Sequence, residues 1–111
     1  MNNLHLSEEA QNDLAKIKAY IMGELENPDA ALATVSRITK KIRDLKNQAY
    51  IGTPLSSVAD TESNYRFLVS GNYLIFYRAY AKDVYIDRVL YGRRDYMRIL
   101  FDDAQTNETD E

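Results

Sequence analysis

Hydrophobic and polar positions follow two different periods along the chain, which divide it into a helical half and a strand half. From Ser7, a good N-cap, to Leu25, apolar residues recur every three or four positions, as on one face of a helix, and Gly23 with the Asn27-Pro28 pair ends that helix. This first stripe is Ala10, Leu14, Ile17, Ile21 and Leu25. Asn27 and Pro28 are suited to start a second helix. Its stripe is Leu32, Val35, Ile38, Ile42 and Leu45. The two stripes predict an antiparallel hairpin of helices with one face turned toward a core.

The second half of the chain has the pattern of strands joined by tight turns. A polar segment with Gly and Pro predicts a loop over residues 47–63. Three segments rich in aromatic and β-branched residues follow as predicted strands: 65–69, 73–80 and 84–91. We also predict a short opening strand at residues 2–6 and a terminal helix at residues 93–100. Helices that precede a strand meander imply an α+β fold, with the helical hairpin packed on one face of an antiparallel sheet.

Length and composition favour one small soluble domain. A chain of 111 residues is expected to form a single domain, here residues 1–101. Residues 102–111 contain five acidic residues and no basic one, and we expect this tail to be disordered. Without it the chain carries a small positive charge. The absence of cysteine excludes a disulfide scaffold, and no apolar run is long enough for a membrane helix. With no recognisable signal peptide, we expect a cytoplasmic protein.

Arginine and tyrosine are concentrated in residues 65–101, which hold seven of the nine tyrosines. The arginines of this segment are Arg66, Arg78, Arg88, Arg93, Arg94 and Arg98. Arginine suits phosphate and tyrosine offers a stacking face, so the cluster could bind an anionic partner. Tyrosine is also simply favoured in strands, and this structural interpretation stays open. No nucleotide-binding or metalloprotease motif is present. His5, the one histidine, lacks a catalytic partner in sequence, and we expect no metal or cofactor.

The sequence resembles the RelE/ParE family of toxins from bacterial type II toxin–antitoxin (plasmid stabilisation) systems. The resemblance covers about residues 4–101 and is carried by a strand beginning Tyr65-Arg66, a Gly turn, a strand ending Phe76-Tyr77-Arg78, and the run RVLYGRRD. It implies a growth-inhibiting toxin neutralised by a cognate antitoxin protein, with which it would form a hetero-oligomer. Members of the family either poison DNA gyrase, as ParE does, or cleave mRNA in the ribosome, as RelE does.

The resemblance favours the ParE-like activity because two cationic positions of the RelE nucleases are here Leu68 and Leu74. A ParE-like toxin would bind gyrase through these residues: Arg88, Arg93, Arg94, Tyr96 and Arg98. As an alternative, an endoribonuclease would draw its catalytic residues from another set: Arg66, Arg78, Arg93, Arg94, Tyr91 and Tyr96. A second alternative is an inactive remnant that only binds the antitoxin. In each case we expect the antitoxin to lay a helix or strand across the helical hairpin and the sheet.

Overall fold

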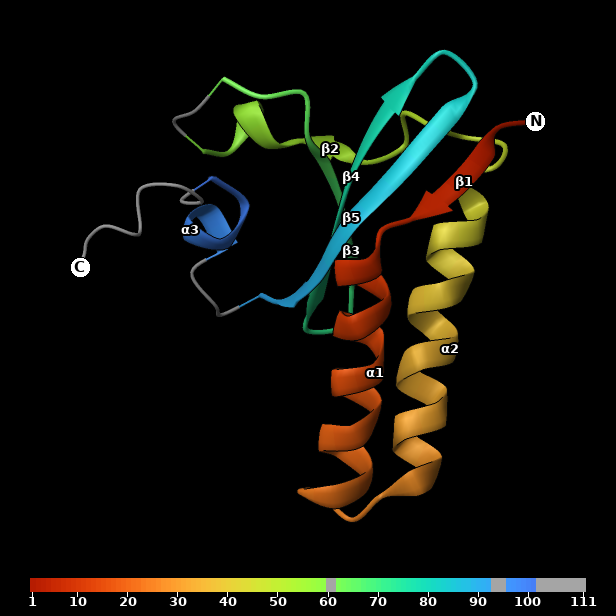
Figure 1. Cartoon of the computed structure of the whole chain (residues 1–111), viewed down its shortest axis with the longest axis vertical. Coiled ribbons are helices and arrows are strands. Elements are labelled where there is room, and N and C mark those ends of the chain that lie inside the picture. Colours follow the sequence, from red (N-terminus) through yellow and green to blue (C-terminus); the bar gives the residue numbers. More distant parts are fainter. Residues whose placement is uncertain (60–61, 93–95, 102–111) are drawn as a thin grey trace.

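The computed structural model describes residues 1–59, 62–92 and 96–101, and this part of the chain has the predicted α+β fold (Figure 1). Along the described residues, a short edge strand is followed by two helices, then by the other strands of the sheet and a short helix. The elements are β1 (Asn3–Leu6), α1 (Glu8–Gly23), α2 (Pro28–Asp44), β2 (Thr53–Pro54), the 3-10 turn η1 (Leu55–Ser57), β3 (Arg66–Ser70), β4 (Tyr73–Tyr80), β5 (Asp83–Tyr91) and α3 (Tyr96–Phe101). Neither α1 nor α2, the long helices of the described part, combines the length and apolarity needed to cross a membrane.

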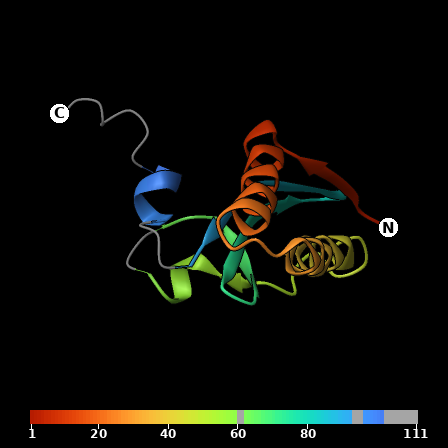
Figure 2. The same ribbon diagram turned by 90° about the horizontal axis from the view of Figure 1, so that it is seen from below.

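Both helices of the hairpin start where the sequence predicts. The Ser7 Oγ accepts a hydrogen bond from the Ala10 backbone N–H at 2.9 Å, which satisfies one free donor of the first turn of α1. The Asn27 Oδ1 does the same for the Ala30 N–H at 3.0 Å, and Pro28 takes the first position of α2. The two helices lie side by side in both views (Figures 1 and 2).

The apolar stripes are buried except at the far end of the hairpin. Ile17, Ile38 and Ile42 are buried as predicted, whereas Leu25 and Leu32 are 57% and 58% exposed. These two leucines flank the turn between the helices, and this end of the hairpin extends past the sheet (Figure 1). No strand covers them there, so their predicted place in the core was wrong.

The sheet has the strand order β1-β5-β4-β3-β2. β3, β4 and β5 form the predicted antiparallel meander, and β4 has the predicted bounds. β1 joins the outer edge of β5 in parallel, with Leu4 opposite Val84 and Leu6 opposite Ile86. The sheet is therefore mixed, because the first strand pairs with the last one rather than with a neighbour in sequence.

The predicted loop at residues 47–63 contains short regular elements, and for residues 53–57 the prediction was wrong. β2 pairs with β3, and the Leu55 N–H donates to the Tyr65 carbonyl at 2.9 Å. Leu55 itself is fully buried. The segment is held because the Gly52 N–H donates to the Tyr77 hydroxyl at 2.9 Å. Because this segment is rich in Gly, Pro and Ser, its composition does not reveal that it places one apolar residue, Leu55, in the protein interior.

The sheet has an apolar cluster on each face. α1 and α2 cover one, where Ile75 and Tyr77 of β4 are fully buried. α3 and Leu55 cover the other, where Phe76 and Leu90 are buried. Successive strand residues point to opposite faces, which accounts for this division of β4. We call these the helix face and the α3 face. The first residues of the predicted terminal helix, 93–95, and the acidic tail, 102–111, lie outside the described residues.

Candidate functional site

A β-bulge at Asp87 organises the polar residues of the sheet. In the β4–β5 pair Phe76 lies opposite Arg88 and Tyr77 lies opposite Ile86, so Asp87 is the extra residue. Its carbonyl oxygen accepts a hydrogen bond from the Ser7 Oγ at 2.8 Å, which ties the bulge to the start of α1. The bulge lets two consecutive residues of β5 each form an ion pair with a different element.

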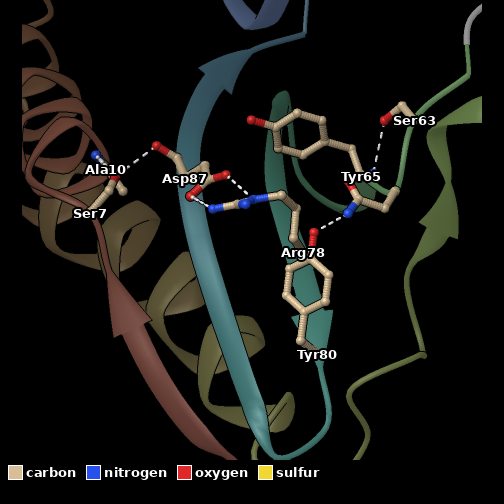
Figure 3. Close-up of polar contacts among 8 residues, drawn as sticks. Ser7, Ala10, Ser63, Tyr65, Arg78, Tyr80 and Asp87 are labelled. Carbon is tan, nitrogen blue, oxygen red and sulfur yellow. Dashed lines mark hydrogen bonds and ion pairs between the residues drawn. The ribbon is translucent and has the colours of Figure 1, made fainter.

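The first ion pair joins Asp87 to Arg78 across β5 and β4 (Figure 3). The Arg78 Nε and Nη2 donate to the two carboxylate oxygens at 2.6 and 3.2 Å. These hydrogen bonds, more than any other contact, raise the pKa of Arg78 above its ordinary value. The guanidinium carbon lies 6.0 Å from the centre of the Tyr80 ring and 5.5 Å from that of Tyr85, within cation–π range. Arg78 is thus fixed on the α3 face by four neighbouring contacts.

Tyr65 lies beside this pair, and its side chain points toward Asp87 in Figure 3. Burial, followed by the charge of Asp87 and a hydrogen bond to it, raises the pKa of the Tyr65 hydroxyl to about 12. A pocket of about 260 Å³ opens here, with Ser7, Glu9 and Arg88 on one side and Ile99 and Leu100 of α3 on the other. The hydroxyl is held protonated at neutral pH, so Tyr65 can donate a proton in a hydrogen bond but is a poor base.

The second ion pair joins Arg88 to Asp13 of α1. The Arg88 Nε and Nη2 donate to the carboxylate at 2.8 and 2.9 Å, and the Val89 N–H donates to the same group at 2.9 Å. Asp13 is only 7% exposed, so three hydrogen bonds compensate its burial. Sequence reasoning missed this residue. The signal was available, because position 13 falls inside the apolar stripe, three residues after Ala10 and four before Ile17.

Arg66 lies on the helix face of the sheet, the face opposite to that of Arg78, and bonds to backbone groups there. It lies across from Tyr77 in the β3–β4 register, and directly opposite residues share a face. Its Nη1 donates to the carbonyl oxygens of Gly52 and Tyr50 at 2.7 and 3.2 Å. Its guanidinium carbon lies 5.0 Å from the centre of the Tyr50 ring. Arg66 therefore anchors the segment before β2 and lies on the helix face, whereas Arg78 lies on the α3 face.

The remaining predicted site residues do not join a single cluster. Tyr91 ends β5 with its ring centre 5.8 Å from that of Tyr73, which packs on the helix face. Tyr96 lies on the α3 face, 5.3 Å from the Phe76 ring. Arg98 is on an exposed side of α3. Arg93 and Arg94, which belong to both predicted sets, lie outside the described residues.

The described members of the nuclease set are therefore divided by the sheet, with Arg66 and Tyr91 on the helix face and Arg78 and Tyr96 on the α3 face. The target-binding role of Arg88, Tyr96 and Arg98 stays a prediction. Among residues 1–59, 62–92 and 96–101, no three His, Cys, Asp or Glu side chains are grouped closely enough to hold a metal ion.

His5 has structural partners in the described part of the chain. Its Nε2 lies 2.9 Å from the Asp83 Oδ1, and its ring stacks on that of Tyr85 at 4.8 Å. The hydrogen bond from His5 is the main cause of a lowered pKa at Asp83. Both contacts bridge β1 and β5, so this histidine fastens the edge strand.

A groove of about 610 Å³ lies between the helical hairpin and the end of the meander. Its apolar residues come from α1, from Leu25 just after it, and from β4 and β5, whereas α2 contributes Thr34. The lining includes Lys16, Ile17, Tyr20, Leu25, Tyr73 and Tyr91. Tyr20 is 54% exposed and Leu25 is also open to solvent. A groove of this volume, lined mainly by apolar and aromatic residues, fits an apolar segment of a partner protein.

The raised pKa of Tyr65 predicts a loss of stability at alkaline pH. Its folded-state pKa of about 12 lies above the ordinary value of 10.0, so the unfolded chain releases this proton first. The stabilisation is complete below pH 10 and is lost as the pH rises toward 12. Replacing Tyr65 with Phe should make the free energy of unfolding fall less steeply over this range, as measured by urea unfolding at several pH values. An equally steep fall in Tyr65→Phe would contradict the assignment to Tyr65.

Comparisons with known proteins identify a matching family and similar solved structures for this chain. A family model described as the ParE toxin of the type II toxin–antitoxin system parDE matches residues 4–96. A solved structure from the chromosomal ParDE system of P. aeruginosa is similar with a TM-score of 0.68 and 24% identity, over 82% of this chain and 96% of the other. YafQ from E. coli strain BL21(DE3) is similar with a TM-score of 0.50 and 16% identity, over 91% and 99%. No curated protein sequence matches.

Proposed function

This chain belongs to the family of ParE toxins of type II toxin–antitoxin systems, and we propose that it inhibits growth by acting on DNA gyrase. The proposal rests on the family and on one structural observation. Two of the cations expected of a ribonuclease, Arg66 and Arg78, are bonded to other groups of the protein and lie on different faces of the sheet. Arg78 is paired with Asp87 on one face, and Arg66 holds two backbone carbonyls on the other.

The electrostatics of the sheet also support binding rather than phosphodiester chemistry. A cation stabilises a reacting phosphate most when it is aimed at the developing charge and is free to contact it. Arg78 and Arg88 each already satisfy a carboxylate with two hydrogen bonds. Withdrawing either from its partner would leave an unpaired carboxylate, which is most costly at the buried Asp13. Arg66 and Arg78, the described strand arginines of the nuclease set, therefore fit a structural role better than a catalytic one.

We further propose that a cognate antitoxin occupies the groove between the helical hairpin and the meander. Its walls are mostly apolar and include two exposed residues from the open end of the hairpin, Tyr20 and Leu25. Exposed apolar surface of this kind marks binding sites. An amphipathic helix with apolar residues on one face would cover it. Its binding would hide the surface of α1 and the end of β5 together.

Induction of the toxin alone tests the target. Newly made DNA and newly made protein are labelled in short pulses during the first minutes after induction. If gyrase is the target, DNA synthesis stops before protein synthesis, and Arg93→Ala with Arg94→Ala relieves the growth arrest. Lys18→Ala with Lys82→Ala removes the same charge from exposed positions elsewhere and should leave toxicity unchanged.

Two results would contradict this proposal. An earlier arrest of protein synthesis, with cleaved messages on ribosomes, would establish the ribonuclease. Normal growth with abundant folded protein would establish an inactive antitoxin-binding remnant. Full toxicity of the Arg93/Arg94 double variant, with DNA synthesis stopping first, would keep gyrase as the target and remove these two arginines from the binding site.

A further inference from the structure

The densest group of exposed basic residues in the described part of the chain lies on α2 and just after its end. Five basic residues line the outer side and the end of this helix: Arg37, Lys40, Lys41, Arg43 and Lys46. We call them the basic face. All five are exposed, and Asp44 is the single acidic residue between positions 37 and 46. The ion pairs found in the described part of the chain use His5, Arg78 and Arg88, so none involves the basic face.

We propose that the basic face binds the phosphate backbone of duplex DNA. Six helical steps separate Arg37 from Arg43, which is about 9 Å along the axis, and Lys46 lies two residues after the helix ends at Asp44. Duplex DNA carries one negative charge per about 1.7 Å of its axis, so exposed cations spread along this length face several phosphates. Each cation that neutralises a phosphate releases condensed counterions, which drives binding without base readout. This inference goes beyond the proposed action on gyrase and does not depend on it.

The composition of the basic face argues against a protein partner. Protein interfaces need an apolar or aromatic centre, where most of the binding energy is concentrated. No large hydrophobic residue is exposed between Arg37 and Lys46; the nearest are Leu32 and Tyr50. The same lack of aromatic residues disfavours single strands, whose bases stack on aromatic rings. A rigid backbone with dense charge is the partner that cations on one helix can hold.

Stabilisation of the helix explains only part of the cluster. Basic residues in the last turn interact favourably with the helix dipole, which accounts for Lys41 and Arg43. Arg37 and Lys40 lie before this turn, where the dipole effect has faded. In both Figure 1 and Figure 2, α2 lies on the opposite side of the molecule from α3. DNA on α2 would leave α3 uncovered.

Fluorescence anisotropy with a labelled duplex of mixed sequence tests the proposal on the full chain. With five phosphate contacts, raising the salt from 50 to 200 mM should weaken binding by roughly 500-fold. Lys40→Gln with Lys41→Gln should bind on the order of 100-fold more weakly at 50 mM salt and lose only about 40-fold over the same salt range, because about two contacts are removed. Lys18→Gln with Lys82→Gln changes the net charge equally and should retain the binding of the original chain.

Three outcomes would overturn the proposal. Equal losses in the two double variants would mean that net charge, and not the basic face, governs binding. If an unlabelled single strand competed as well as the duplex, the basic face would not prefer duplex DNA. The absence of binding at 50 mM salt would refute the site, provided that the thermal unfolding curve shows a folded chain. All substituted lysines are exposed, so the fold should tolerate glutamine there.

Discussion

Replacement of Asp13 with Asn is expected to lower the free energy of unfolding by about 3 kcal/mol, because the Arg88 guanidinium then lies partly buried without its carboxylate. The Val89 N–H would also lose a charged acceptor. The midpoint of thermal unfolding should fall by about 10 to 20 °C in a domain of this size. Urea unfolding followed by circular dichroism measures the difference directly.

An exposed aspartate in the other helix provides the control for this substitution. Asp44→Asn removes the same charge at the end of α2 and should change the free energy of unfolding by less than about 0.5 kcal/mol. Adding Arg88→Met to Asp13→Asn should restore part of the loss, since no unpaired charge then remains. If the two single aspartate variants were equally stable, the Asp13–Arg88 ion pair would not be a determinant of the fold.

Replacement of Tyr20 with Asp is expected to abolish co-elution of the toxin with its antitoxin. Tyr20 is 54% exposed and lines the groove, so the substitution places a charge in the proposed apolar interface without disturbing the core. Loss of a central tyrosine contact typically costs at least about 2 kcal/mol, or roughly 30-fold in the dissociation constant, and the buried charge adds to this loss. Size-exclusion chromatography of the two purified proteins, followed by titration calorimetry, measures the effect.

The control introduces the same charge on an exposed apolar residue outside the groove. Val58 is 60% exposed, follows η1 and does not line the groove. Val58→Asp should bind antitoxin as the original chain does. In cells, the antitoxin should fail to restore growth only to the Tyr20→Asp toxin. Normal rescue of that variant would place the antitoxin elsewhere on the molecule.

The sequence predicts the fold well wherever one local rule decides the structure. Ser7 and Asn27 are predicted helix caps because their side chains satisfy donors only three residues away. The bounds of β4 follow from turn residues on both sides. Leu32 was misplaced because the helical period shows which residues share a stripe but not how far the sheet extends beneath it.

The site is less predictable because its contacts join residues far apart in the chain. Arg66, Arg78 and Arg88 look equally available in the sequence, since their internal partners come from other elements or across a turn. The β-bulge also has no composition signal, because its extra residue is an ordinary aspartate rather than a glycine. The basic side of α2 was visible in the sequence, but only the structure shows that its side chains are exposed and take no part in the ion pairs of the described residues.

The parallel pairing of β1 with β5 has a consequence for the order of folding during synthesis. Asn3–Leu6 leave the ribosome well before their partners, residues 83–86, which follow about 80 positions later. The Asp13–Arg88 ion pair likewise joins two residues that are far apart in the sequence. Contacts between distant parts of a chain form late because loop closure must precede them. The nascent chain can form its helical hairpin early, but it cannot complete the sheet before β5 is translated. The sheet, and with it every surface that includes β5, therefore forms only after β5 has been synthesised.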